Sequence, residues 1–81
     1  MIDPNHVVTK AEFVDFVHEL RMSFLQEPHH WENKSIDSYL DGLGGWIEDC
    51  EGAYTNRKER LPDHINWNFI ARMLAAASTY E

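Results

Sequence analysis

The sequence predicts an all-α protein, a small three-helix bundle with helices at about residues 10–26, 35–55 and 67–79. In three segments, apolar residues recur every three or four positions, which is helical periodicity. Each segment follows a residue that can cap a helix N-terminus, and no alternating β-branched run suggests a strand. An 81-residue chain has room for one domain. We therefore expect one helical domain over residues 9–81, preceded by a flexible N-terminal arm over residues 1–8.

The first predicted helix begins with a capping box, in which the side chains of Thr9 and Glu12 satisfy free backbone amides. Pro28 disfavours helical geometry at the residue before it, so the helix is expected to end near Gln26. Its apolar positions are Phe13, Val17, Leu20 and Phe24.

The second predicted helix combines an apolar stripe with three glycines in four positions. Ser35 or Asn33 can cap it. Gly42, Gly44 and Gly45 each cost about 1 kcal/mol relative to alanine, yet the apolar stripe stays in phase across them. We expect them to point away from the core and to permit either close approach of another chain or a kink. The residues expected to face the core are Ile36, Tyr39, Leu40, Leu43, Trp46, Ile47, Cys50 and Tyr54.

The third predicted helix follows Asn66, a residue that can act as its N-terminal cap. Its small side chains permit close packing against the other helices. Its in-phase positions are Trp67, Ile70, Ala71, Leu74, Ala75 and Ser78.

A second stripe on the middle helix is acidic: Asp37, Asp41, Glu48 and Glu51 share one side with Gly44, and no basic residue lies between positions 35 and 56. Like charges at helical spacing repel by a few tenths of a kcal/mol per pair, so this row does not stabilise the helix. It is either a solvated face or a docking edge for a basic partner, because burial against guanidinium or ammonium groups would turn repulsion into attraction.

The formal charge of −7 disfavours direct binding to nucleic acid or to an anionic membrane. One cysteine cannot form an internal disulfide, and the sequence has no signal segment and no run of 18 apolar residues. A cytoplasmic setting is therefore expected.

The sequence contains no complete motif for a metal site, a reactive thiol or a catalytic site. The histidines His29 and His30, with Glu32, lack the spacing of metal ligands, and neither an H-x3-H nor a C-x2-C pair occurs. Cys50 lies on the apolar stripe, which favours a buried, inert thiol. No catalytic set accompanies the carboxylates. We therefore expect no metal, no cofactor and no enzymatic activity.

Three segments, "HHWENKSIDSYLDGLGGWIED", "EGAYTNRKERLP" and "INWNFIARMLAAASTYE", resemble an uncharacterised family of small acidic bacterial proteins, a domain of unknown function. The shared pattern is W-E-N-x-[ST], then W-[IL]-x-D, and a terminal Tyr-Glu, over roughly residues 9–81. Members of this family usually have alanine where this chain has Gly44 and Gly45. The resemblance thus implies an unbroken helix at these positions and no established activity.

A second resemblance is to the barstar family of intracellular ribonuclease inhibitors. It covers Glu32 to Trp46, where an E-N step precedes an acidic helix in both sequences. In barstar, two aspartates of this helix enter the active site of the ribonuclease. The matching positions here are Asp37 and Asp41. The chain differs from barstar in having two extra residues after Glu32-Asn33 and no counterpart of the parallel sheet. The resemblance implies an inhibitor-type role for the acidic helix.

These observations favour a non-catalytic binding protein of immunity or inhibitor type, whose acidic helix blocks a basic site on a toxin, a nuclease or a nucleic-acid-binding protein. Two alternatives stay open: an acidic nucleic-acid mimic encoded by a phage or mobile element, and a structural homo-oligomer, such as a homodimer, formed through the glycine flank. The expected binding residues are Asp37, Asp41, Glu48 and Glu51 for charge, Gly42, Gly44 and Gly45 for close approach, and His29, His30 and Trp31 as flanking contacts.

Overall fold

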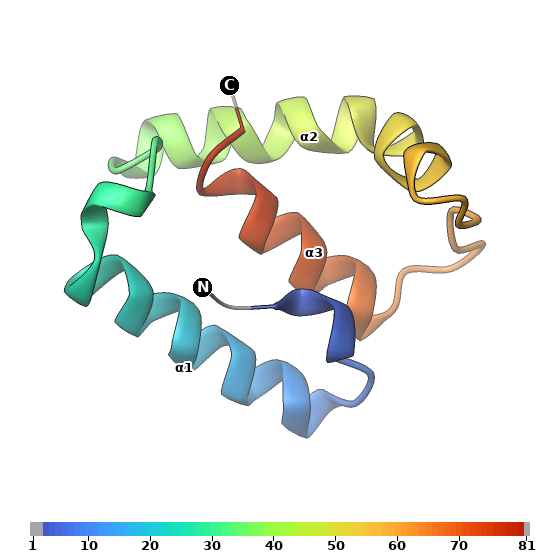
Figure 1. Cartoon of the computed structure of the whole chain (residues 1–81), viewed down its shortest axis with the longest axis horizontal. Helices are drawn as coiled ribbons and strands as arrows, with labels where there is room; N and C mark the ends of the chain where they lie inside the picture. The colour runs from blue at the N-terminus through green and yellow to red at the C-terminus, as the bar shows by residue number, and fades with distance from the viewer. Residues whose placement is uncertain (1–2, 81) are drawn as a thin grey trace.

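A computed structural model describes residues 3–80 of the chain. It contains helices α1 (Lys10–Gln26), α2 (Ile36–Asn56) and α3 (Trp67–Ala77), with short 3-10 turns η1 (Pro4–His6) and η2 (Pro28–His30). The all-α prediction is confirmed, and the first two helices agree with their predicted bounds to within one residue. The third helix ends at Ala77 rather than near residue 79. Helix α3 crosses diagonally between α1 and α2 and packs against both (Figure 1).

Each helix begins at the expected cap. Thr9 Oγ1 accepts a hydrogen bond from the Glu12 amide at 3.1 Å, and the Glu12 carboxylate accepts one from the Thr9 amide at 2.9 Å. The amide bonds to this carboxylate hold the pKa of Glu12 below its usual value. Ser35, rather than Asn33, caps α2, and the Asn66 side chain accepts from the Phe69 amide at 2.8 Å to cap α3.

Helix α2 ends in a Schellman motif. The Lys58 amide donates to the Thr55 carbonyl and the Glu59 amide donates to the Tyr54 carbonyl, both at 2.9 Å. This geometry places Lys58 at φ 58°, the left-handed region in which a side chain is unfavourable.

Replacing Lys58 by glycine is therefore expected to raise the free energy of unfolding by about 1 kcal/mol, because glycine adopts positive φ without the steric cost of a Cβ. Urea unfolding followed by circular dichroism would measure the change. Lys58→Ala is the control, since it removes the charge and keeps the Cβ; an equal gain in both variants would contradict the conformational explanation.

The core lies on both sides of α3. On the α2 side, Phe69 packs with Trp46, Cys50 and Tyr54. On the α1 side, Ala71 packs with Phe16 and Val7. Cys50 is a buried free thiol, as predicted. Helix α3 is thus the central element, and α1 and α2 each bury one face against it.

Residues 3–8 do not form the separate arm that was expected; residues 1 and 2 lie outside the described residues. The Asn68 side-chain amide on α3 donates to the carbonyls of Pro4, Asn5 and Val7, at 3.2, 3.2 and 2.8 Å. Val7 is only 5% exposed and belongs to the core. The Asn68 side chain thus joins the N-terminal segment to the helical domain. The apolar pattern of the sequence did not indicate this role, because Asn68 is polar.

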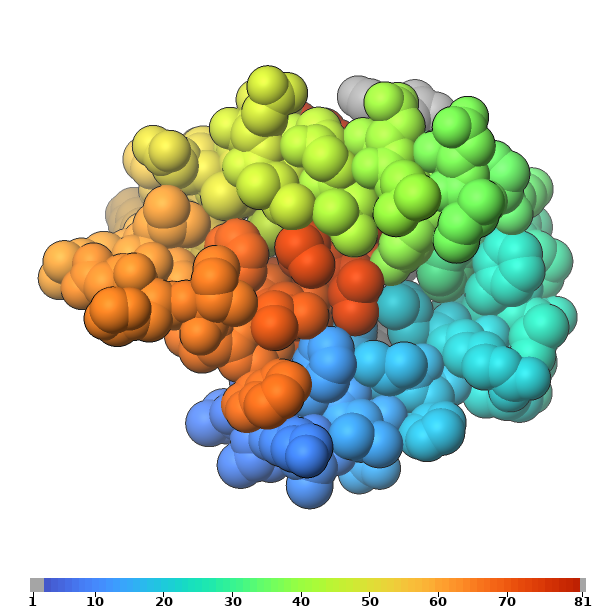
Figure 2. All heavy atoms as spheres, turned by 180° about the vertical axis from the view of Figure 1, so that it is seen from behind, coloured from blue at the N-terminus to red at the C-terminus, as the bar shows by residue number. Residues whose placement is uncertain are grey.

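The core-facing stripe predicted for α2 is partly wrong. Trp46, Cys50 and Tyr54 are buried, but Ile36, Leu40 and Ile47 are 76%, 56% and 42% exposed. The buried side of α2 is rotated toward Gly42, which faces the C-terminal segment. Seen from behind, α2 and α1 border a hollow with α3 at its floor (Figure 2). Among the described helices α2 packs chiefly against α3, so one edge of its apolar stripe is left uncovered.

Candidate functional site

The acidic residues of α2 lie on its outer face. Asp37, Asp41, Glu48 and Glu51 are all exposed. None of them takes part in an ion pair within residues 3–80. Two arginines that follow α2 are engaged elsewhere: Arg57 pairs with Glu59 at 2.8 Å and Arg60 with Asp63 at 3.2 Å. The acidic row is therefore not neutralised by the described part of its own chain.

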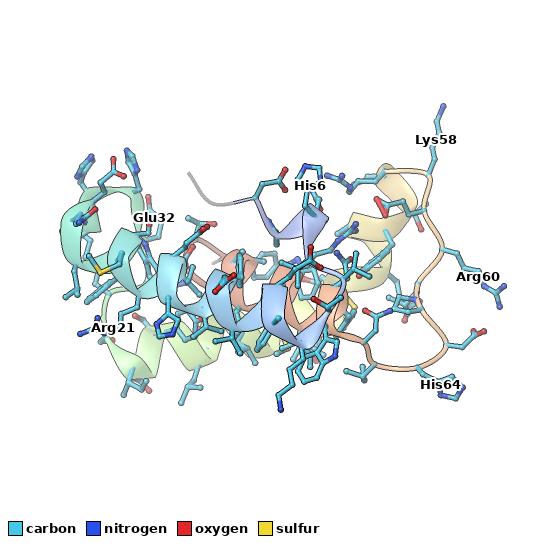
Figure 3. The ribbon with its side chains drawn as sticks, turned by 90° about the horizontal axis from the view of Figure 1, so that it is seen from below. His6, Arg21, Glu32, Lys58, Arg60 and His64 are labelled. Carbon is cyan, nitrogen blue, oxygen red and sulfur yellow. The ribbon has the colours of Figure 1, made fainter. Side chains whose placement is uncertain are left out.

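Figure 3 shows that the side chains of Lys58, Arg60 and His64, all on the loop between α2 and α3, extend away from the helices. The described ion pairs include none between this loop and the acidic row of α2. Since no described basic side chain pairs with the α2 carboxylates, their mutual repulsion is screened by solvent.

A shallow groove of about 500 Å³ runs beside the acidic row. Gly44 and Gly45 contribute to it together with Asp41 and Glu48, and the Tyr80 side chain lines it from the C-terminal segment. The Tyr80 hydroxyl donates a hydrogen bond to Asp49, and this bond raises the pKa of Tyr80. A Cβ built on Gly44 would meet no atom within 4 Å, so its side of the helix is open. The groove thus places the accessible helix backbone at Gly44 beside the carboxylates of Asp41 and Glu48.

Gly42 has a different role from the one expected, because it does not face outward. A Cβ at this position would lie 2.6 Å from Asn33 Nδ2, 2.7 Å from the Tyr80 carbonyl and 2.9 Å from the Ala77 carbonyl. Gly45 is closed in part by the Tyr80 ring, which would lie 3.1 Å from a Cβ at that position. The close approach that the sequence suggested is made by the chain's own C-terminal segment, and the glycine flank at 42 and 45 is not a free surface for a second copy.

The three residues of the connector between α1 and α2 that were expected to contact a partner differ in exposure. Trp31 is 9% exposed, packs edge-on against Phe24 and stacks on Tyr39, so its predicted contact with a partner is wrong. His29 and His30 are exposed. Together with Glu27, rather than the Glu32 considered from sequence, they place possible ligand atoms within 4.8 Å of one another. All three side chains lie at the surface, on the turn that leads from α1 toward α2.

Leu40 and Ile47 were missed as surface residues. They are seven positions apart on α2, hence on one side of it, and each immediately precedes an acid of the row, Asp41 or Glu48. Nothing in the periodicity could separate them from the core, because they are in phase with Trp46 and Cys50. We define the α2 face as the exposed acids Asp37, Asp41, Glu48 and Glu51 together with Gly44, Leu40 and Ile47. It offers an apolar contact bordered by negative charge.

Comparison with known proteins gives a family but no activity. A family model described as a family of unknown function, DUF7660, matches residues 9–81. No curated protein and no solved structure matches the chain. Within residues 3–80, no helix has both the length and the apolar character needed to cross a lipid bilayer.

Proposed function

Because the chain belongs to the DUF7660 family, whose function is unknown, we propose its function from its surface: it is a non-catalytic protein that binds a basic partner protein through the α2 face. The observation that supports this most strongly is the row of four exposed carboxylates with no ion pair among the described residues. An immunity or inhibitor role, in which this face blocks a basic site on a toxin or nuclease, is the most specific form of the proposal.

The chemistry of the face selects its partner. Lysine or arginine side chains placed against Asp41 and Glu48 would remove the repulsion along α2 and add charge-assisted hydrogen bonds. Leu40 and Ile47 would bury apolar surface at about 25 cal/mol per Å². The open backbone at Gly44 lets a partner side chain approach α2 closely. A basic, amphipathic segment of a protein satisfies all three features.

The alternatives are less well supported. A second copy of the chain would bring the same row of acids against itself in a two-fold contact, which is repulsive. A nucleic-acid backbone would be repelled by the same charges. A nucleic-acid mimic remains a special case of the proposal, since its target is also a basic protein surface, and competition with DNA would identify it.

Charge reversal tests the proposal. The wild-type protein is immobilised, its partner is captured from a lysate of the native host and purified, and the dissociation constant is measured with the Asp41→Lys/Glu48→Lys variant. We expect the affinity to fall about 100-fold or more, since two attractive contacts become repulsive. Affinity of the wild-type protein should also weaken as salt is raised.

The matched control is Asp15→Lys/Glu19→Lys, which makes the same change in net charge on exposed positions of α1. It should change the affinity by less than about threefold if the contact is local rather than a response to overall charge. Retained affinity in the α2 variant, with an intact circular dichroism spectrum, would refute the proposal, and so would equal losses in the two variants. Self-association by sedimentation with no other protein bound would favour the homo-oligomer instead.

A further inference from the structure

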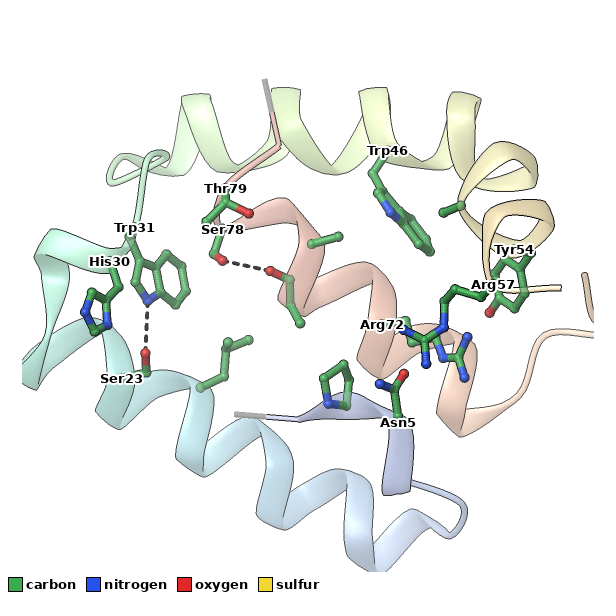
Figure 4. Close-up of a pocket in the computed structure, with 15 residues that line it drawn as sticks. Asn5, Ser23, His30, Trp31, Trp46, Tyr54, Arg57, Arg72, Ser78 and Thr79 are labelled. Atoms are coloured by element: carbon green, nitrogen blue, oxygen red, sulfur yellow. Dashed lines mark hydrogen bonds between the residues drawn. The ribbon is translucent and has the colours of Figure 1, made fainter. Parts of the chain in front are cut away.

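A second concave site lies away from the α2 face. It is a groove of about 330 Å³ between α1, α2 and α3, within the lower range of small-molecule sites. Its middle is apolar, with Leu20, Trp46 and Ala75 among its lining residues. Figure 4 shows its two polar ends: Ser23, His30 and Trp31 at one, and Tyr54, Arg57 and Arg72 with Asn5 at the other. None of these residues belongs to the α2 face.

The arginine end of the groove holds buried polar atoms without partners. Within residues 3–80, the Tyr54 hydroxyl and the Arg72 Nε make no hydrogen bond, and Tyr54 is only 5% exposed. A buried donor left unpaired costs about 1–3 kcal/mol, and such groups are uncommon in native proteins. Burial raises the pKa of Tyr54, so its hydroxyl keeps its proton and remains a donor.

Glu59 does not satisfy these groups. Its carboxylate accepts from the two Nη atoms of Arg72 at 3.3 and 3.0 Å and from Arg57 Nε at 2.8 Å. The contacts with Arg57 and Arg72 hold the pKa of Glu59 below its usual value, so it stays ionised. The hydrogen bond to Glu59 raises the pKa of Arg57, and the charge of Asp3 adds to it. Asp3 makes its described contacts with Asn5 and His6. Among the described residues, the Nη atoms of Arg57, the Tyr54 hydroxyl and Arg72 Nε therefore all lack a hydrogen-bond acceptor.

Access to the two buried donors requires neighbouring side chains to move. Both atoms have less than 1 Å² of accessible surface. Arg57 lies next to them, since its Nε and Arg72 Nη1 bond the same Glu59 oxygen. Its side chain is 54% exposed and sits just before the left-handed turn that ends α2. Rotation of this exposed side chain is the movement that we take to uncover them, and its guanidinium can follow the ligand as an additional donor.

We propose that this groove binds a small organic acid with an aromatic or other apolar body: the body lies between Leu20, Trp46 and Ala75, and the carboxylate accepts from the Tyr54 hydroxyl, Arg72 Nε and Arg57. The apolar middle supplies contact area, while the donor-rich end supplies the preference for an anion. A carboxylate matches this end because it accepts several hydrogen bonds and brings no donors.

The test uses two probes of similar shape, 2-naphthoate and the uncharged 2-naphthalenemethanol, titrated into the ¹⁵N-labelled full chain. Shifts of the Trp46 indole N–H and the arginine Nε–H resonances report binding and its place. We expect 2-naphthoate to bind about tenfold more tightly than the alcohol, and Tyr54→Phe and Arg57→Gln each to reduce its affinity about fivefold or more.

Two controls separate binding from folding. Tyr54→Phe removes an unpaired buried hydroxyl and keeps the ring that stacks on Phe69, so its melting temperature should equal or exceed that of the wild type. Arg60→Gln removes the same charge as Arg57→Gln from a residue that does not line the groove, and should leave affinity unchanged. Equal binding of the two probes, or unchanged affinity in both Tyr54→Phe and Arg57→Gln, would overturn the proposal. Neither result depends on the α2 face, whose charge-reversal variant should bind 2-naphthoate normally.

Discussion

Gly42→Ala is expected to lower the free energy of unfolding by about 3 kcal/mol, whereas Gly44→Ala, two positions along the same helix, should raise it by about 1 kcal/mol. At Gly42 the new Cβ would lie within 3 Å of three heavy atoms, two of which are backbone carbonyl oxygens that cannot rotate away. At Gly44 the Cβ would meet open space, so only the helix propensity of alanine counts.

Urea unfolding of the two variants beside the wild type, followed by circular dichroism, would measure both changes. The two substitutions have the same chemistry and lie in the same helix, so each serves as the other's control. A stabilising Gly42→Ala would show that the C-terminal segment does not pack against α2 as described. A destabilising Gly44→Ala would show that this position is covered.

The opposite changes in unfolding free energy expected at Gly42 and Gly44 show that the glycines of α2 have different roles. Gly42 is required by the fold, since the chain returns across α2 at that point and no larger residue fits. Gly44 is not required by any described contact, so its cost of about 1 kcal/mol remains uncompensated within the domain. It is the one glycine of the three that still invites a functional explanation, and it lies among the acids of the α2 face.

The sequence predicts the fold well where local chemistry decides. Thr9, Ser35 and Asn66 each begin a helix because their side chains satisfy amides within their own first turn. The end of α1 before Pro28 is also a local effect. The solvent exposure of Ile36, Leu40 and Ile47 is not decided locally. Periodicity defines which side of α2 is apolar, but the position of α3 determines how much of that side is covered.

The candidate site, like the fold, is predictable from sequence only where a residue's position along its own helix decides its exposure. The exposed acids follow from their phase on α2. The burial of Trp31 instead depends on how it packs between Phe24 and Tyr39, and the contacts of Gly42 depend on where residues 77–80 return. The Tyr54, Arg57 and Arg72 cluster joins α2 to α3 across a loop, so no spacing in the chain could reveal it. Several residues of the shared family pattern, including Trp31, Asn33 and Ser35, have structural roles here, which explains why the pattern indicates a fold and not an activity.

Asn33→Asp is expected to lower the free energy of unfolding at pH 7 by about 4 kcal/mol, although the side chain keeps its size. The Asn33 amide is 9% exposed at the residue level and donates to the carbonyls of Ala77 at 2.8 Å and Tyr80 at 2.7 Å. An ionised carboxylate has no proton to donate and would place negative oxygens opposite both carbonyls. Thermal or urea unfolding would measure the loss, and Asn56→Asp, which adds the same charge at an exposed position, should cost less than about 1 kcal/mol.

The size of this effect follows from how α3 ends. The last carbonyls of a helix lack partners within it, and here each has one from elsewhere: the Leu74 carbonyl accepts from the Tyr39 hydroxyl, those of Ala75 and Ala76 accept from the amides that follow, and that of Ala77 accepts from Asn33. Burial beside carbonyl oxygens would raise the pKa of the introduced carboxyl in the folded protein above its unfolded value of about 4. A raised pKa favours folding only while the carboxyl is protonated, so the deficit should be smallest near pH 4 and grow as the pH rises through the folded value. A deficit independent of pH between 4 and 7 would mean that lost packing, and not the unpaired carbonyls, accounts for the destabilisation.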